Sequence, residues 1–377
     1  MADDERVCVE TEEMFLNMGP QHPSTHGVLR FILRTDSEII DECEPDIGFL
    51  HRGIEKLAEG LTYSQFMPYT DRLDYLASMN YNWGWCLAVE RLSGYEVTAR
   101  AEYLRVIMAE LCRIASHLIA VGALSLDMGA STPFTYNLRE REYINDLFEE
   151  LCGNRLLFNY YRIGGVSQDI PARWDQRCLK FLDYLTPRIK EFNDLISYQK
   201  IFIHRLIDIA VISAEDAISY GLVGPNLRAS GVDWDLRRDE PYSIYPKLNF
   251  KVCIPSNLRG TLGDCYHRYW VRIWEMEESA KIIRQCLAGL PDGDIMSKVP
   301  KSIKLPKGEL YFRTEAPRGE FGVHLVSDGG KSPYRVKIRT GSFSAMAIMK
   351  KAARGLMIPD LVALIGSLDI VAPEVDR

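Results

Sequence analysis

The stretch that sets the fold of this sequence is Gly19-Pro20-Gln21-His22-Pro23-Ser24-Thr25-His26-Gly27. Its prolines fix φ and lack a backbone donor, while the glycines at its two ends adopt backbone angles that other residues resist. Strand-like apolar runs flank it, from Met14 to Met18 and from Val28 to Leu33. The pattern predicts a β-hairpin whose loop presents His22 and His26. A plain turn whose histidines only bond the backbone is the alternative interpretation.

Outward from this loop, the chain predicts short β elements near both ends and helices between them. Residues 12–46 and 309–339 have β character, and a turn at 43–48 ends the first of these segments. The loop at 224–238 is too rich in Gly, Pro and Asp to be regular structure, and its structural interpretation is a well-packed connector. Helices are expected at 51–57, 71–92, 100–124, 137–151, 175–196, 203–220, 261–287, 343–353 and 358–365.

These elements predict an α+β fold with a helical-bundle core and β elements near the N-terminus and in the C-terminal third. The expected division is an N-terminal β region with the histidine loop, a helical core, a small β region, and a C-terminal helical segment with its tail, at residues 1–50, 51–305, 306–345 and 346–377.

The helix expected at 100–124 carries charges on a face with little room for water. Glu110, Arg113 and His117 lie among apolar residues such as Ile114. We expect these charges to pair inside the protein, which requires good geometry because burial removes their hydration. His117 is interpreted as structural.

Composition limits the possible functions. The chain has 377 residues and a net charge of −7, which argues against a nucleic-acid surface. Its nine cysteines contain no C-x-x-C pair, so the usual local signature for zinc, iron-sulfur or dithiol sites is missing. Motifs of serine hydrolases, zinc peptidases, P-loop proteins and dinucleotide-binding folds are absent. The acidic start and the short apolar runs at 118–126 and 356–371 predict a soluble or peripheral chain on the cytoplasmic side.

Five motifs, in order, resemble one family, the 49-kilodalton (D) subunit of respiratory complex I, the proton-pumping NADH:quinone oxidoreductase. The resemblance runs from about residue 12 to the last residue. The motifs are Gly19 to Gly27, Asp71-Arg72-Leu73-Asp74-Tyr75, Leu126-Asp127-Met128-Gly129-Ala130, the loop 224–238, and the closing Asp369-Ile370-Val371 with Glu374-Val375-Asp376-Arg377.

This family is similar in fold to the large subunit of nickel-iron hydrogenases, which holds its metal with two C-x-x-C pairs. The corresponding places here read Asp74-Tyr75-Leu76-Ala77 and Val371-Ala372-Pro373-Glu374, without a thiolate. These side chains cannot rebuild soft thiolate ligation of nickel and iron. The resemblance therefore implies that the chain holds no metal and no iron-sulfur cluster, and that the quinone headgroup binds in the vacated cavity.

The resemblance assigns three catalytic residues, His26, Tyr75 and Asp127. His26 and Tyr75 resemble the family's contacts to the two ends of the quinone headgroup, with His22 as a supporting neighbour, and Asp127 resembles the carboxylate behind the histidine. Reduction of a quinone builds negative charge on two opposite oxygens, so an acid is needed at each end. A carboxylate behind the histidine orients its ring and stabilises the cation.

The electron donor implied by the resemblance is a 4Fe-4S cluster in a neighbouring small subunit. Arg52 and Arg72 resemble the arginines beside that cluster, where fixed positive charge raises its potential. Exposed arginines without this role are the alternative. Mitochondrial members have a histidine where this chain has Leu157, which puts in doubt proton-coupled redox behaviour that depends on that histidine. The family also more often shows Ala-Pro before Ser342 and Phe343.

The function implied is that of the quinone-site subunit of a complex I type enzyme, active only in the assembled complex. Expected partners are the cluster-bearing small subunit, the 30-kilodalton (C) subunit and a membrane-arm subunit lining the quinone channel, at the cytoplasmic face of the bacterial plasma (inner) membrane. Ubiquinone and menaquinone both remain open as the substrate. Two alternatives also stay open, the same subunit in a ferredoxin- or deazaflavin-dependent relative and a non-redox scaffold.

Overall fold

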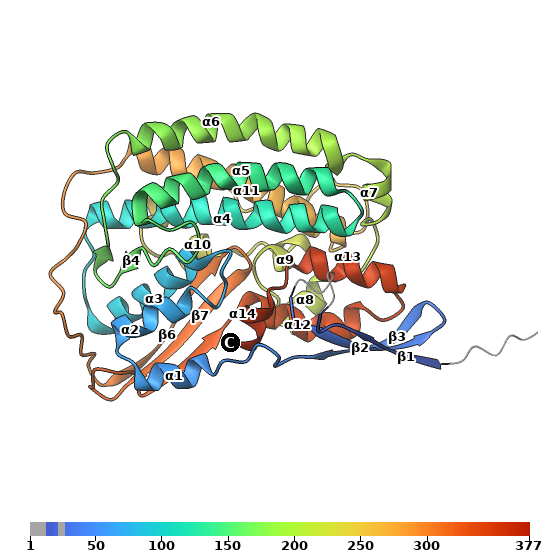
Figure 1. Cartoon of the computed structure of the whole chain (residues 1–377), viewed down its shortest axis with the longest axis horizontal. Coiled ribbons are helices and arrows are strands. Elements are labelled where there is room, and N and C mark those ends of the chain that lie inside the picture. Colours follow the sequence, from blue (N-terminus) through green and yellow to red (C-terminus); the bar gives the residue numbers. More distant parts are fainter. Residues whose placement is uncertain (1–12, 22–26) are drawn as a thin grey trace, which may run out of the picture.

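The computed structural model describes residues 13–21 and 27–377. It confirms the predicted hairpin, because β1 (Glu13–Met18) pairs antiparallel with β2 (Arg30–Asp36). A third antiparallel strand, β3 (Ile39–Asp46), completes a small sheet that extends away from the body of the molecule in Figure 1. His22 and His26 fall in residues 22–26 and lie outside the described residues.

The helical core is built around α4 (Ala99–Asp127). In Figure 1, the axis of α4 lies alongside those of α5 (Ser131–Cys152), α6 (Trp174–Phe192) and α11 (Cys265–Ala288), and the four helices form the upper part of the molecule. By length and apolar content α4, which includes the apolar run at 118–126, is long enough to cross a membrane. Its most apolar window is 89% buried within the fold, which is typical of a core helix.

A second three-stranded sheet lies beneath this helical layer (Figure 1). Its antiparallel strands are β6 (Gly308–Ala316), β7 (Gly319–Ser327) and β8 (Arg335–Arg339), in that order. The helix α3 (Ser78–Ser93) packs on β6 and β7, and Gly84 lets it approach closely, since a Cβ there would lie 2.4 Å from the Phe321 ring. The tight β6–β7 turn, with Ala316 opposite Gly319, carries Arg318 into the interior.

Shorter elements connect these layers. They are α1 (Ile54–Gly60), α2 (Tyr63–Thr70), β4 (Tyr161–Arg162), β5 (Gly165–Val166), a π-helical turn (Asn193–Ser197), α7 (Lys200–His204), α8 (Ala214–Ser219), α9 (Gly224–Ala229), α10 (Leu236–Asp239), a 3-10 turn (Tyr245–Lys247), α12 (Gly341–Ala352), α13 (Ile358–Leu368) and α14 (Ala372–Asp376).

Three local expectations were wrong. The helix expected at 203–220 is interrupted, because Asp208 and Ala210 have positive φ values that a helix excludes. The loop at 224–238 was expected to lack regular structure, but it contains the short helices α9 and α10. Most of it is buried, which confirms the accompanying interpretation as a well-packed connector. The helix expected from residue 71 begins only at Ser78, since residues 71–77 form turns that place Asp74 and Tyr75 at the site described below.

One hydrophobic cluster extends from Met18 to Val375 and joins residues of both sheets and of the helical layer. A continuous core of this kind positions distant segments of the chain against one another. The structure confirms the α+β class. The division into four regions and the likeness to the hydrogenase large subunit stay predictions.

Candidate active site

Tyr75 lies in the turns between α2 and α3, beside a fully buried carboxylate. The Tyr75 side chain is 38% exposed, whereas its neighbour Asp74 has no exposed surface. Asp74 accepts a hydrogen bond from the Leu76 backbone N–H at 3.1 Å, which holds the turn. Burial raises the pKa of Tyr75, and the positive charge of Arg318 opposes that rise. The phenol thus borders open space on one side and buried charges on the other.

Arg318 joins the turn that carries Tyr75 to the end of α13. Its guanidinium donates to Asp74 Oδ2 at 2.6 Å and to Asp369 Oδ1 at 3.0 Å, and it also donates to the Asp369 carbonyl at 3.0 Å and to Ser116 Oγ at 3.1 Å. Arg272 lies 3.7 Å from the other Asp369 oxygen. All these side chains are buried or nearly so. The arginine can satisfy two buried carboxylates because its planar fork presents several donors at once.

Glu374, in α14, adds a third buried carboxyl to this region. Tyr81 Oη donates to Glu374 Oε1 at 2.5 Å, and Ser342 Oγ bonds Oε2. Burial and the charge of Asp74 raise the pKa of Glu374 to about 7, while Arg318 acts in the opposite direction. The segments 74–77 and 371–374, where the resemblance predicted the missing thiolate pairs, therefore lie near each other in the fold.

Asp127 lies at the C-terminal end of α4 and is partly buried. Its carboxylate packs against α13, because a Cβ at Gly366 would lie 2.9 Å from Asp127 Oδ2. Asp369, whose negative charge raises the pKa of Tyr75, is the C-cap residue of the same helix. Asp127 thus packs against α13 near its end, and the residue that ends this helix is close enough to act electrostatically on Tyr75.

Gly27 is where the described chain resumes after the histidine loop. A Cβ at Gly27 would lie 3.1 Å from the Ala372 side chain, at the start of α14. The end of the loop segment therefore packs against the segment that carries Glu374. The predicted roles of His22 and His26 are not tested, because both residues lie outside the described residues.

Arg52 has internal partners in the fold. Its guanidinium donates to three carbonyl oxygens, those of Leu50 at 3.1 Å, Arg72 at 2.8 Å and Pro373 at 2.7 Å. It thereby fastens the C-terminal tail to the segment after β3 and to the turn that precedes Tyr75. Its predicted place beside a partner's cluster stays a prediction.

Arg72 is half-exposed and lies next to a buried acid. Its guanidinium donates to the Pro68 carbonyl at 2.6 Å and lies 3.7 Å from Asp71 Oδ2. Asp71 is fully buried, and among the described residues neither carboxyl oxygen has a partner at hydrogen-bond geometry. Burial raises the pKa of Asp71 to about 7, against the opposing charges of Arg72 and Arg162. Leu157, where the resemblance predicted a departure from a histidine of mitochondrial members, is only partly buried.

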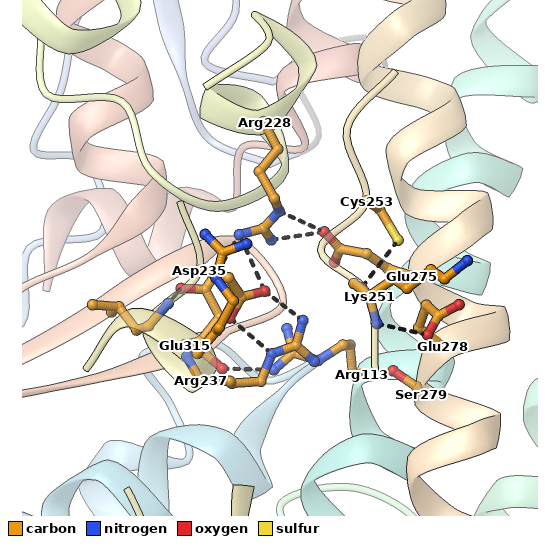
Figure 2. A network of polar contacts seen from close by, with 12 residues as sticks. Arg113, Arg228, Asp235, Arg237, Lys251, Cys253, Glu275, Glu278, Ser279 and Glu315 are labelled. Carbon is orange, nitrogen blue, oxygen red and sulfur yellow. Dashed lines mark hydrogen bonds and ion pairs between the residues drawn. The ribbon is translucent and has the colours of Figure 1, made fainter. Parts of the chain in front are cut away.

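A separate buried network ties α4, α9, α10, α11 and β6 together (Figure 2). Arg228 lies between Glu275, at 2.7 Å, and Glu315, at 2.8 Å. Arg237 pairs with Asp235 at 2.7 Å. Figure 2 shows these groups reaching toward one another from different elements. The network fixes the connector at 224–238 and, through Glu315, the strand that leads to Arg318.

The charges on α4 pair inside the protein, as their sequence context predicted. Glu110 lies 3.1 Å from Arg113 and 3.2 Å from Arg237, and His117 lies 2.9 Å from Glu275. Burial lowers the pKa of His117, which fits a structural hydrogen bond. An open pocket of about 720 Å³ lies elsewhere, between α3 and β6, and contains none of the predicted site residues.

Sequence reasoning missed the charged set near Tyr75, which consists of Asp74, Arg272, Arg318, Asp369 and Glu374. The sequence gives only a weak signal for a buried Arg318, because an arginine in a tight hairpin turn usually faces solvent. The charge count offers a clue in retrospect, since the two buried acids Asp74 and Glu374 need a buried cation nearby. Within 13–21 and 27–377, no group of three or more His, Cys, Asp or Glu side chains is placed to hold a metal ion.

The fold and this site define a mixed α+β protein whose buried charges surround a half-exposed tyrosine. Residues 127–303 and 297–377 match the family described as respiratory-chain NADH dehydrogenase, 49 Kd subunit. The chain belongs to this family, and it is a subunit of an oxidoreductase complex of the complex I type.

Three relatives that match over nearly the whole chain are each named as a D subunit of an NADH-quinone oxidoreductase. The D 1 subunit of Anaeromyxobacter sp. strain K is 55% identical over 372 residues, which cover 99% of this chain and 98% of the relative. The D 2 subunit of Sorangium cellulosum is 55% identical over 369 residues, covering 97% and 95%. The D subunit of Bacillus cereus is 51% identical over 369 residues, covering 98% and 100%. The resemblance inferred from the five motifs is confirmed.

Proposed function

We propose that this chain forms one wall of the quinone-reduction chamber of a complex I type NADH:quinone oxidoreductase. Electrons arrive from a 4Fe-4S cluster in a partner subunit, and membrane partners couple the reaction to proton translocation. The observation that carries the proposal is Tyr75, a half-exposed phenol with buried Arg318 behind it. Such a phenol can contact a bound group and release a proton to it.

The chemistry assigns one acid to each end of the headgroup. Two electrons and two protons convert the quinone carbonyls to hydroxyls, so each oxygen receives one proton. In the proposal, the Tyr75 hydroxyl donates to one oxygen and His26 donates to the other, with His22 as a polar neighbour. Asp127 stabilises the cationic form of His26. Arg318 favours loss of the Tyr75 proton because its positive charge stabilises the phenolate.

One contact and one electrostatic interaction support a chamber at this place. Gly27, the residue after His26, packs against Ala372. Two residues further along the chain, Glu374 belongs to the charged set that acts on Tyr75 through Arg318 and Asp74. The loop that carries the predicted histidine and the turn that carries the predicted tyrosine thus meet the same C-terminal segment.

The proposed surroundings follow from the family. The chain sits at the cytoplasmic face of the bacterial plasma membrane, between the cluster-bearing small subunit, the 30-kilodalton (C) subunit and a membrane-arm subunit. Arg52 and Arg72 lie on the side of the cluster. The relatives named above are NADH-quinone oxidoreductase subunits, which favours NADH over ferredoxin or deazaflavin as the electron source.

Replacing Tyr75 with Phe tests the proposal in the assembled enzyme. The Tyr75→Phe variant should lose most quinone reductase activity, by about 10²-fold or more, because one headgroup oxygen loses its proton donor. NADH oxidation with an artificial acceptor should stay unchanged. A matched control is Tyr220→Phe, since Tyr220 is also 38% exposed but lies at the end of α8. Full quinone reductase activity in the Tyr75→Phe enzyme would refute the assignment.

A further inference from the structure

Glu374 is a buried carboxyl that can be hydrogen-bonded in either protonation state. When ionised, it accepts from Tyr81 Oη, from Ser342 Oγ and, at 3.3 Å, from the Ser342 backbone N–H. When protonated, its own hydroxyl can donate to Ser342 Oγ, which is also placed 3.2 Å from the Val371 N–H as an acceptor. The hydrogen-bond partners of Glu374 can therefore stay in place when its carboxyl loses or gains a proton.

The charges around Glu374 leave one negative charge in excess. Asp74, between α2 and α3, and Asp369, at the end of α13, are both bonded by Arg318 from the β6–β7 turn. Arg272 of α11 adds a second positive charge, 3.7 Å from Asp369. Three ionised carboxyls against two arginines sum to −1, and one bound proton makes the set neutral. Tyr81 of α3 is the remaining titratable group that contacts Glu374.

The extra proton belongs on the carboxyl that no arginine bonds. Arg318 donates directly to Asp74 and Asp369, whereas the side-chain donors to Glu374 are hydroxyls alone. Uncompensated charge is costly in such a buried place, so Glu374 is where neutralisation gains most. The raised pKa of Glu374, about 7, agrees with this assignment. Burial also raises the pKa of Asp74, but Arg318 bonds that carboxylate directly.

We propose that Glu374 is a positioning residue for quinone reduction, holding the proton that keeps the charged set behind Tyr75 neutral. This rests on the proposed role of Tyr75. Arg318 and Asp74 are close enough to act on both Tyr75 and Glu374. When Glu374 is protonated, the positive charge of Arg318 is free to stabilise the Tyr75 phenolate. When Glu374 ionises, its charge offsets Arg318 and the phenol releases its proton less readily.

The expected consequence is a falling limb in the pH profile of quinone reduction. Because activity depends on the protonated form of Glu374, it falls as pH rises through about 7. The quinone reductase activity of the wild-type complex should decrease several-fold between pH 6 and pH 8. The rate of NADH oxidation with an artificial acceptor, which measures electron input alone, should not fall over this pH range.

Two variants of the assembled complex test the role of Glu374. Glu374→Gln cannot ionise, so the ratio of activities at pH 8 and pH 6 should rise close to one. Ser342→Ala removes a donor to the carboxylate and should move the limb to higher pH. The control Glu278→Gln changes a buried glutamate of α11 that bonds Lys281 and the Lys251 N–H, and it should keep the wild-type limb.

The outcomes separate this inference from the proposed function. A wild-type limb in both Glu374→Gln and Ser342→Ala, together with lost activity in Tyr75→Phe, overturns the role of Glu374 and leaves that of Tyr75 standing. Full activity in Tyr75→Phe overturns the proposed function itself. If Glu374→Gln does not assemble, the shift in Ser342→Ala decides, and an unshifted limb refutes the inference.

Discussion

At the scale of single residues, Arg318 decides the local chemistry. It is fully buried and holds Asp74 and Asp369 within hydrogen-bond distance. A buried ion pair of this kind adds little net stability, because removal of water from the charges offsets much of their attraction. Its clear effect is to fix geometry, since it orders the turn of Tyr75 and the end of α13 against each other.

Asp71 provides a residue-scale prediction about pH and stability. Its pKa is about 7 in the fold and near 3.8 in the unfolded chain, so between these values the folded state holds a proton that the unfolded state releases. Stability contributed by this group is therefore highest at low pH and falls as pH rises toward 7. Asp71→Asn removes the ionisation. Its stability advantage over wild type should grow by about 2–3 kcal/mol from pH 5 to pH 8.

Urea unfolding of the full chain at the two pH values measures this effect. Asp183→Asn serves as the control, because Asp183 is well exposed and paired with Arg284. We expect no comparable growth for the control. An advantage of Asp71→Asn that is constant with pH would show that Asp71 is ionised throughout in the folded chain.

At the scale of elements, the contact between α9 and the β6–β7 turn positions Arg318. Gly224 has a φ of +62°, and a Cβ there would lie 2.3 Å from the Gly319 Cα. Because both partners are backbone, neither can move without displacing the turn. Gly224→Ala should destabilise the chain by about 2–4 kcal/mol through backbone strain and overpacking.

A matched glycine replacement separates crowding from a general effect of alanine. Gly60, in α1, has no atom within 4 Å of the place where an alanine methyl group would lie, so Gly60→Ala should be neutral or slightly stabilising in urea unfolding. Equal stabilities of the Gly224→Ala and Gly60→Ala chains would argue that the turn tolerates displacement and that Arg318 is less firmly placed than we infer.

Helices with a strong local signal could be predicted from the sequence. The helix expected at 100–124 matches α4, and the pattern at 19–27 predicted the β1–β2 hairpin. The failures occur where distant contacts override local preference. Residues 203–220 are apolar enough for a helix, yet the chain breaks there and the Ile212 N–H donates to the Gly263 carbonyl. Partners so far apart in sequence leave no local pattern.

At the scale of the whole molecule, the C-terminal tail ties distant segments together. Asp376 accepts from the Gly48 and Leu50 backbone N–H groups at 2.8 and 2.6 Å, and Arg52 bonds the Pro373 carbonyl. The candidate site shares this property, because Arg318 is 244 positions from Asp74. The resemblance supplied Tyr75 and Asp127, but the charge balance behind Tyr75 required the three-dimensional structure.

The most direct test of the central claim is a cryo-EM map of the assembled complex with quinone bound. We expect one headgroup oxygen at hydrogen-bond distance from Tyr75 Oη, the other facing His26, and Arg318 still bridging Asp74 and Asp369 behind the tyrosine. A headgroup that is reduced where it binds, yet contacts neither Tyr75 nor His26, would contradict the claim.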